Sequence, residues 1–134
     1  MTPLPRFDPN WALFLDFDGT LAEIADTPER VEVEAQLGPS LHAMYDALHG
    51  ALAIISGRPI AEIDAFLDPL VLPVAGLHGL ERRTPGGLIV RHAKVGTALQ
   101  EARRGLDALA RSIPGVRIED KSLTLAVHYR AAPH

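Results

Sequence analysis

Residues 11–20 read Trp-Ala-Leu-Phe-Leu-Asp-Phe-Asp-Gly-Thr, and this stretch decides the fold class. It opens with a continuous apolar run, residues 11–15, that stops at a polar segment containing Asp16 and Asp18. A run that is apolar on both faces is typical of a buried strand in a parallel sheet, because helices cover both sides of such a sheet. The stretch therefore predicts a buried strand that ends in a polar loop.

The same order of strand, polar turn and helix recurs downstream. Residues 51–55 form a second apolar run that ends at Ser56-Gly57-Arg58, and residues 60–67 after it have helical spacing. Residues 39–49 also have helical spacing, and residues 71–75 form a third apolar run. Strands that alternate with helices predict an α/β fold with a parallel, Rossmann-like sheet and right-handed crossovers.

The pattern changes after the third strand. We expect a hairpin, then a long amphipathic helix over residues 95–113, then two strands around Asp120-Lys121-Ser122. This order suggests a core over residues 1–98 and the start of a smaller α/β part over residues 99–134. The chain stops just after the last of these strands, which is an awkward end for a compact domain.

Composition excludes several classes of protein. The 134 residues suit one domain or part of a larger one, and thirteen basic against seventeen acidic residues give a net charge of −4. That balance argues against nucleic-acid binding, which needs a basic face. There is no cysteine, no signal peptide and no apolar run near the roughly 20 residues of a membrane-spanning helix. We expect a cytoplasmic protein, and composition carries no information on its oligomeric state.

The strongest chemical signal is the pair Asp16 and Asp18, followed by Gly19 and Thr20. Ligands of parallel α/β sheets bind outside the carboxyl ends of the strands, where this loop lies. One carboxylate can attack phosphorus while the other gives and then takes a proton. Two carboxylates this close also favour a hard cation such as Mg²⁺. The alternative is an ordinary turn or helix cap.

A second signal, Ser56-Gly57-Arg58, again follows a predicted strand and opens a helix. A hydroxyl and backbone amides at a helix N-terminus form a site for an anion such as phosphate. Serine and glycine are also ordinary capping residues, so this motif indicates a phosphate site only in combination with the first loop.

These two loops resemble motifs I and II of the haloacid dehalogenase superfamily of phosphatases. Two further stretches narrow the resemblance to the trehalose-6-phosphate phosphatases: Ala75-Gly-Leu-His-Gly-Leu-Glu-Arg-Arg83 and Glu119-Asp-Lys-Ser-Leu-Thr-Leu-Ala-Val-His-Tyr-Arg130. The resemblance runs in order from about residue 11 to the last residue. It implies a phosphatase that hydrolyses trehalose 6-phosphate through an aspartyl-phosphate, with Mg²⁺ as cofactor.

The resemblance also implies a role for each matching residue. Asp16 is expected to be the nucleophile and a Mg²⁺ ligand, and Asp18 the general acid and base whose backbone carbonyl also binds the metal. The expected phosphate-binding residues are Gly19, Thr20, Ser56 and Gly57. The expected substrate-binding residues are Arg58, His78, Glu81, Glu119 and Lys121.

Some of these residues also suit a purely structural role. Glu119 and Lys121 also suit a solvated hairpin tip, and His78 suits a histidine that is hydrogen-bonded to backbone in a turn. We expect Arg82 and Arg83 at a solvated strand end, and we interpret His128 as structural or lining the smaller part.

Two loops of the superfamily have no counterpart in this sequence. They are a lysine that stabilises the phosphoryl charge and an acidic pair that completes the Mg²⁺ shell, and in the family both come after the cap. We therefore expect a fragment that holds part of the core and the start of the cap, without the C-terminal half of the core. The alternatives are another sugar-phosphate phosphatase of the superfamily, or a truncated, catalytically dead phosphate-binding module.

Overall fold

The structure is a computed structural model that describes residues 5–25, 27, 30–92 and 96–132. It divides into two compact units, Met1–Val90 and Arg91–His134. The domain boundary predicted between residues 98 and 99 stays a prediction, and it falls in the first turn of helix α3, Thr97–Ser112.

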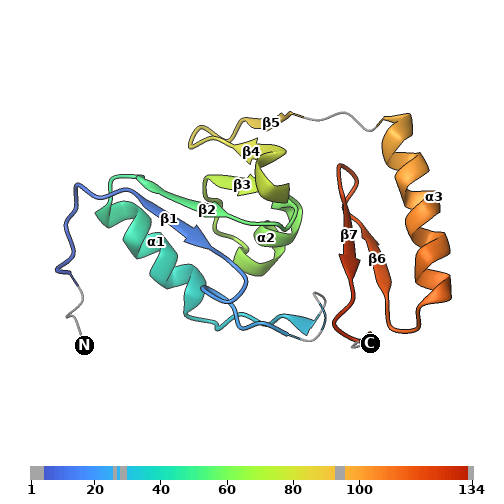
Figure 1. Ribbon diagram of the computed structural model, residues 1–134. Helices are drawn as coiled ribbons and strands as arrows, with labels where there is room; N and C mark the ends of the chain where they lie inside the picture. Colours follow the sequence, from blue (N-terminus) through green and yellow to red (C-terminus); the bar gives the residue numbers. More distant parts are fainter. Residues whose placement is uncertain (1–4, 26, 28–29, 93–95, 133–134) are drawn as a thin grey trace. The chain divides into compact units, whose positions relative to one another are not determined.

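Unit 1 is built on a mixed sheet in the order β1-β2-β3-β4-β5 (Figure 1). Strands β1 and β2 are parallel, as are β2 and β3, whereas β3 and β4 are antiparallel. The strand bounds are Leu13–Asp16, Leu52–Ile55, Val74–Gly76, Glu81–Arg83 and Ile89–Arg91. The predicted α/β fold is confirmed, and its first three strands are parallel as expected.

Helices α1, Leu37–Ala47, and α2, Ile60–Leu67, connect the parallel strands and supply the core of unit 1. Their apolar positions are buried together with alternate residues of β2 and with Phe17, which follows β1. The fully buried side chains of this core include Phe17, Leu41, Leu48, Leu52, Ile54 and Ile63. This core supports the strands whose carboxyl ends lead into the two polar loops.

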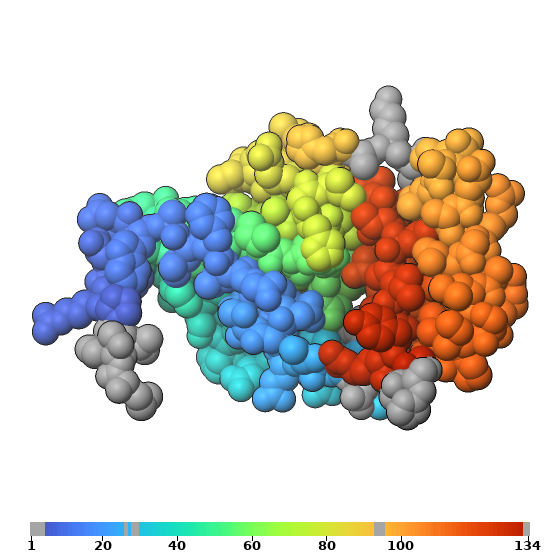
Figure 2. Space-filling model, in the orientation of Figure 1, coloured from blue at the N-terminus to red at the C-terminus, as the bar shows by residue number. Residues whose placement is uncertain are grey.

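The other face of β1 and β2 carries apolar side chains that stay exposed. Phe14 is 71% exposed and Ile55 is 41% exposed. Both line a shallow, mostly apolar hollow of about 420 Å³. Figure 2 shows the segment around β1, in blue, at the surface of unit 1.

Unit 2 contains α3 and the antiparallel pair β6, Arg117–Asp120, and β7, Leu125–His128. Arg103 on α3 forms an ion pair with Asp120 at the end of β6, which joins the helix to the hairpin. In the part of the chain that the structure describes, no helix has the length and apolar character needed to cross a membrane.

The third strand begins later than the apolar run predicts. The run covers residues 71–75, but β3 starts at Val74. Pro73 has no backbone N–H and cannot donate to a ladder, although its carbonyl accepts a hydrogen bond from the Ile54 N–H at 3.0 Å. The predicted helix over residues 95–113 is observed as α3, and residue 95 lies outside the described residues.

Candidate active site

Strands β1 and β2 end side by side at one edge of the sheet of unit 1. Asp16, the last residue of β1, pairs in register with Ile55, the last residue of β2. The two loops therefore start at neighbouring points, at Phe17 directly after β1 and at Ser56 directly after β2. This is the edge at which α/β proteins bind their ligands.

The loop after β1 is a tight turn built on the carbonyl of Phe17. That oxygen accepts hydrogen bonds from the N–H groups of Thr20, Leu21 and Ala22 at 2.9–3.3 Å. Gly19 has a φ of +86°, which favours glycine because other residues meet steric strain there. Since Phe17 is completely buried, the turn is anchored in the core while Asp16 stays exposed beside it.

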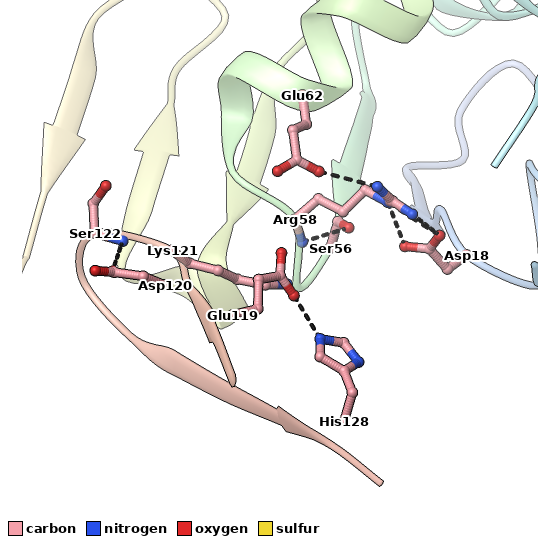
Figure 3. A network of polar contacts seen from close by, with 9 residues as sticks. All are labelled: Asp18, Ser56, Arg58, Glu62, Glu119, Asp120, Lys121, Ser122 and His128. Atoms are coloured by element: carbon pink, nitrogen blue, oxygen red, sulfur yellow. Dashed lines mark hydrogen bonds and ion pairs between the residues drawn. The ribbon is translucent and has the colours of Figure 1, made fainter. Parts of the chain in front are cut away.

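Arg58 lies between two carboxylates and is almost completely buried (Figure 3). Its Nε donates to both carboxylate oxygens of Asp18 at 2.9 and 3.0 Å, and its Nη2 donates to Asp18 Oδ1 at 2.8 Å. On the other side, Nη1 donates to Glu62 Oε2 at 3.0 Å. The guanidinium carbon also lies 5.2 Å from the centre of the Phe66 ring.

Electrostatics keep Arg58 charged. Burial on its own lowers the pKa of Arg58, but the hydrogen bonds and the negative charges of Asp18 and Glu62 outweigh it, and the pKa is raised. The sequence predicted a substrate-binding role for Arg58. With its guanidinium occupied by groups of the protein, holding Asp18 in place fits the geometry better than contact with a substrate.

The loop after β2 is tied to the turn that follows β3. Ser56 is buried; its N–H donates to the Ala75 carbonyl at 2.9 Å, and its Oγ accepts from the Arg58 N–H at 3.0 Å. The His78 N–H donates to the Ser56 carbonyl at 3.1 Å. The exposed His78 ring then lies against Gly57, so the structure brings these predicted site residues together.

Glu81 is buried inside unit 1. Its Oε1 accepts a hydrogen bond of 2.6 Å from the N–H of Ile60, at the N-terminus of α2. A carboxylate at this position satisfies a helix N–H and interacts favourably with the helix dipole. Stabilising α2 therefore fits Glu81 better than the substrate contact predicted from the sequence.

Arg83 lies in a different environment from the one predicted. It is buried, where a solvated strand end was expected. Its two terminal nitrogens each donate to a carboxylate oxygen of Asp64 at 2.7 Å, and its Nε donates to the Leu72 carbonyl at 2.8 Å. The register of β4 against β3 turns Arg83 inward, while the neighbouring Arg82 is exposed as expected.

In unit 2, Glu119 lies between two basic side chains. Its Oε2 is 2.7 Å from His128 Nε2 and 3.7 Å from Lys121 Nζ (Figure 3). All three side chains are partly buried. Glu119 and Lys121 thus form a mixed pair of hydrogen-bond acceptor and donor, which suits a polyhydroxylated ligand.

The sequence motifs do not include two residues that contact Arg58. Glu62 and Phe66 follow Arg58 at intervals of four residues, so they share one side of α2 and its first turn. That spacing is a visible signal, but it identifies a contact only once the loop is known to lead directly into a helix.

The described residues include an incomplete set of candidate metal ligands. None of their His, Cys, Asp or Glu side chains form a group of three or more that could hold a metal ion. Mg²⁺ prefers oxygen ligands and keeps several water molecules, so the exposed carboxylate of Asp16 and the Asp18 carbonyl expected from the resemblance match its chemistry. These groups fit Mg²⁺ as an incomplete set of ligands.

Comparison with known proteins gives consistent matches. A family model described as trehalose-phosphatase matches residues 14–134. The probable trehalose-phosphate phosphatase of Sinorhizobium fredii is 44% identical over 92% of this chain and 46% of its own length. The trehalose-6-phosphate phosphatase of Escherichia coli K12 is 38% identical over 99% of this chain and 50% of its own length.

Solved structures of related proteins are similar to this chain as well. The C-terminal domain of a trehalose-6-phosphate phosphatase from C. albicans has a TM-score of 0.77 at 26% identity, over 89% of this chain and 42% of its own. A phosphatase of the haloalkanoate (HAD) superfamily from Bacteroides thetaiotaomicron has a TM-score of 0.51 at 23% identity, over 98% and 46% of the two chains, and shares the fold.

The chain spans about half the length of the curated relatives it matches. The family model nevertheless covers nearly all of it, from the second residue of β1 to the last residue of the chain. With its haloacid dehalogenase type of fold, the chain belongs to the trehalose-phosphatase family.

Proposed function

We propose that this chain carries the nucleophile and the proton-transfer group of a phosphatase that converts trehalose 6-phosphate and water to trehalose and phosphate. Membership of the trehalose-phosphatase family supports the substrate. The observation that carries the chemistry is the register of Asp16 with Ile55, which starts both polar loops at the same edge of the sheet. A nucleophile and a phosphate-binding loop need this proximity.

In the first proposed step, a carboxylate oxygen of Asp16 attacks phosphorus. Asp18 enters this step protonated, with a proton taken from solvent. The bond between phosphorus and the sugar oxygen breaks, and that oxygen leaves with the electron pair and takes the proton from Asp18. The products are an aspartyl-phosphate and trehalose. Proton donation matters because a sugar alkoxide is a poor leaving group, and general acid catalysis typically contributes about 10²–10⁴-fold in rate.

In the second step, a water oxygen attacks the phosphorus of the aspartyl-phosphate. Asp18, now a carboxylate, takes a proton from that water, and the bond between phosphorus and Asp16 breaks. Inorganic phosphate leaves, and both aspartates return to their starting forms.

The loops around these aspartates suit a phosphate group. We assign phosphate contacts to Gly19, Thr20, Ser56 and Gly57, because tight turns and helix N-termini present N–H and hydroxyl donors to anions. We assign sugar contacts to the exposed His78 and to Glu119 and Lys121. When bound beside Asp16, Mg²⁺ would offset the negative charge that develops as phosphorus is attacked.

The experiment is phosphate release from trehalose 6-phosphate by the purified chain with Mg²⁺. We expect Asp16→Asn to abolish release and Asp46→Asn, an exposed aspartate on α1, to leave it unchanged. Addition of EDTA should stop the wild-type reaction. Other sugar phosphates, assayed in parallel, test the substrate. Release that survives Asp16→Asn, or no release from the wild-type chain, would contradict the proposal.

A further inference from the structure

We propose that Arg58 is a positioning residue for Asp18, with Glu62 and Phe66 holding its guanidinium in place. This inference rests on the proposed function and adds to it three residues that act on proton transfer without contacting the substrate. All four residues belong to unit 1, and Figure 3 shows Arg58 between the carboxylates of Asp18 and Glu62.

The hydrogen bonds from Arg58 to Asp18 have a specific geometry. Two nitrogens of Arg58 donate to the carboxylate, and both carboxylate oxygens accept, at 2.8–3.0 Å. A fork of this kind fixes the plane and direction of a carboxylate, which a single contact cannot do. Asp18 lies in a turn and is 37% exposed, so the turn alone leaves its side chain free to rotate.

Arg58 is itself held rigidly. Its side chain is 7% exposed, Nη1 donates to Glu62, and the guanidinium lies against the face of Phe66. Phe66 in turn packs on the buried Phe17, with ring centres 5.3 Å apart. Because Phe17 separates Asp16 from Asp18 in the sequence, the same packing also anchors the segment that carries both aspartates.

A misplaced proton donor has a recognisable kinetic effect. Loss of the proton donor slows hydrolysis most for esters with the most basic leaving group, because a stable anion can leave without a proton. p-Nitrophenyl phosphate releases a stable anion, phenyl phosphate a more basic one, and trehalose 6-phosphate the most basic. The value of kcat/KM reports the steps up to the first irreversible one, so it isolates departure of the leaving group.

The test compares kcat/KM for these three esters in wild type and Arg58→Lys. Lysine keeps the positive charge but cannot hold a carboxylate with two nitrogens at once, as a guanidinium does. We expect a loss of about 10–10²-fold on trehalose 6-phosphate, less on phenyl phosphate, and less than about threefold on p-nitrophenyl phosphate. Asp18→Asn should give the same order with larger losses. Arg58→Lys should add little in the Asp18→Asn background, because both variants remove the same function.

The chain offers a closely matched control. Arg83 is 6% exposed and grips Asp64, which is 39% exposed, whereas the values for Arg58 and Asp18 are 7% and 37%. Arg83→Lys therefore disturbs a similar buried fork elsewhere in unit 1. We expect any loss it causes to be equal for the three esters. If Arg58→Lys does not fold, as judged by circular dichroism, Glu62→Gln replaces it with the same expected order and smaller losses.

Three results would overturn the inference and are distinguishable from one another. Equal losses on all three esters mean that Arg58 only supports the fold. A loss on trehalose 6-phosphate with equal effects on the two aryl esters means that Arg58 contacts the sugar. Failure of the wild-type chain to hydrolyse any of them contradicts the proposed function itself, and the inference falls with it.

Discussion

The imidazole of His78 lies so close to Gly57 that a Cβ atom on Gly57 would be 2.7 Å from His78 Cε1 and 2.8 Å from Nε2. His78 has a φ of +56°, and its N–H donates to the Ser56 carbonyl. Thus an unusual backbone conformation after β3 places a histidine directly on the loop after β2. A side chain at position 57 would therefore make the His78 ring move, whereas the φ of Gly57 itself is not in the left-handed region.

Gly57→Ala should displace the His78 ring. We expect the free energy of unfolding in urea to fall by no more than about 1 kcal/mol, because the clashing atoms are the outer end of an exposed side chain that can rotate away. In a His78→Ala background most of this loss should disappear, since the clashing ring is gone. Gly86→Ala serves as the control, because a Cβ atom there meets nothing closer than 3.9 Å. Equal losses with and without the His78 ring would rule out the contact as the cause.

Glu81 offers a test of the link between β4 and α2. Glu81→Ala removes the acceptor of the buried Ile60 N–H, and an unsatisfied buried donor costs about 1–3 kcal/mol. Glu81→Gln keeps an acceptor oxygen and should lose less. Urea unfolding gives both values, and hydrogen exchange should show the Ile60 amide less protected in the alanine variant. The idea fails if the two variants are equally stable.

Asp64→Asn should destabilise unit 1 more than a surface substitution does. It leaves the buried, charged Arg83 beside a neutral amide that accepts with only one oxygen. Breaking a fully buried ion pair costs about 3–5 kcal/mol, and because Asp64 is 39% exposed to water we expect about 1–3 kcal/mol. Asp46→Asn, whose partner His42 is exposed, should change stability by less than about 0.5 kcal/mol. Similar losses in the two variants would contradict this assignment.

Local patterns in the sequence predict the elements well. Helix α2 has the predicted bounds, residues 60–67, because Pro59 precedes it and its apolar residues repeat at helical spacing. Strand β2 falls within the second apolar run for a similar reason. The start of β3 is less predictable. Leu72 and Pro73 are as buried as the strand itself, but the nitrogen of Pro73 has no hydrogen to donate to the ladder.

The environment of the predicted site residues is harder to read from the sequence. Arg58 and Asp18 are 40 positions apart, and their contact depends on the parallel pairing of β1 with β2. Arg83 and Asp64 meet only because the antiparallel register of β4 turns one arginine of a pair inward. Motifs identify residue types suited to the chemistry, whereas burial and ion pairing come from tertiary packing.

The last prediction concerns unit 2. Gly115 has a φ of +93°, and a Cβ atom there would overlap the carbonyl oxygen of Ala131. Gly115→Ala therefore meets both backbone strain and a clash with main chain, and we expect a loss of at least about 2 kcal/mol, seen as faster hydrogen exchange in β6 and β7. Gly105→Ala is the matched control: it lies inside the exposed helix α3 with nothing within 4 Å, and alanine there should stabilise by about 0.5–1 kcal/mol. If Gly115→Ala leaves the exchange of β6 and β7 unchanged, the close approach of Gly115 to Ala131 does not hold unit 2 together.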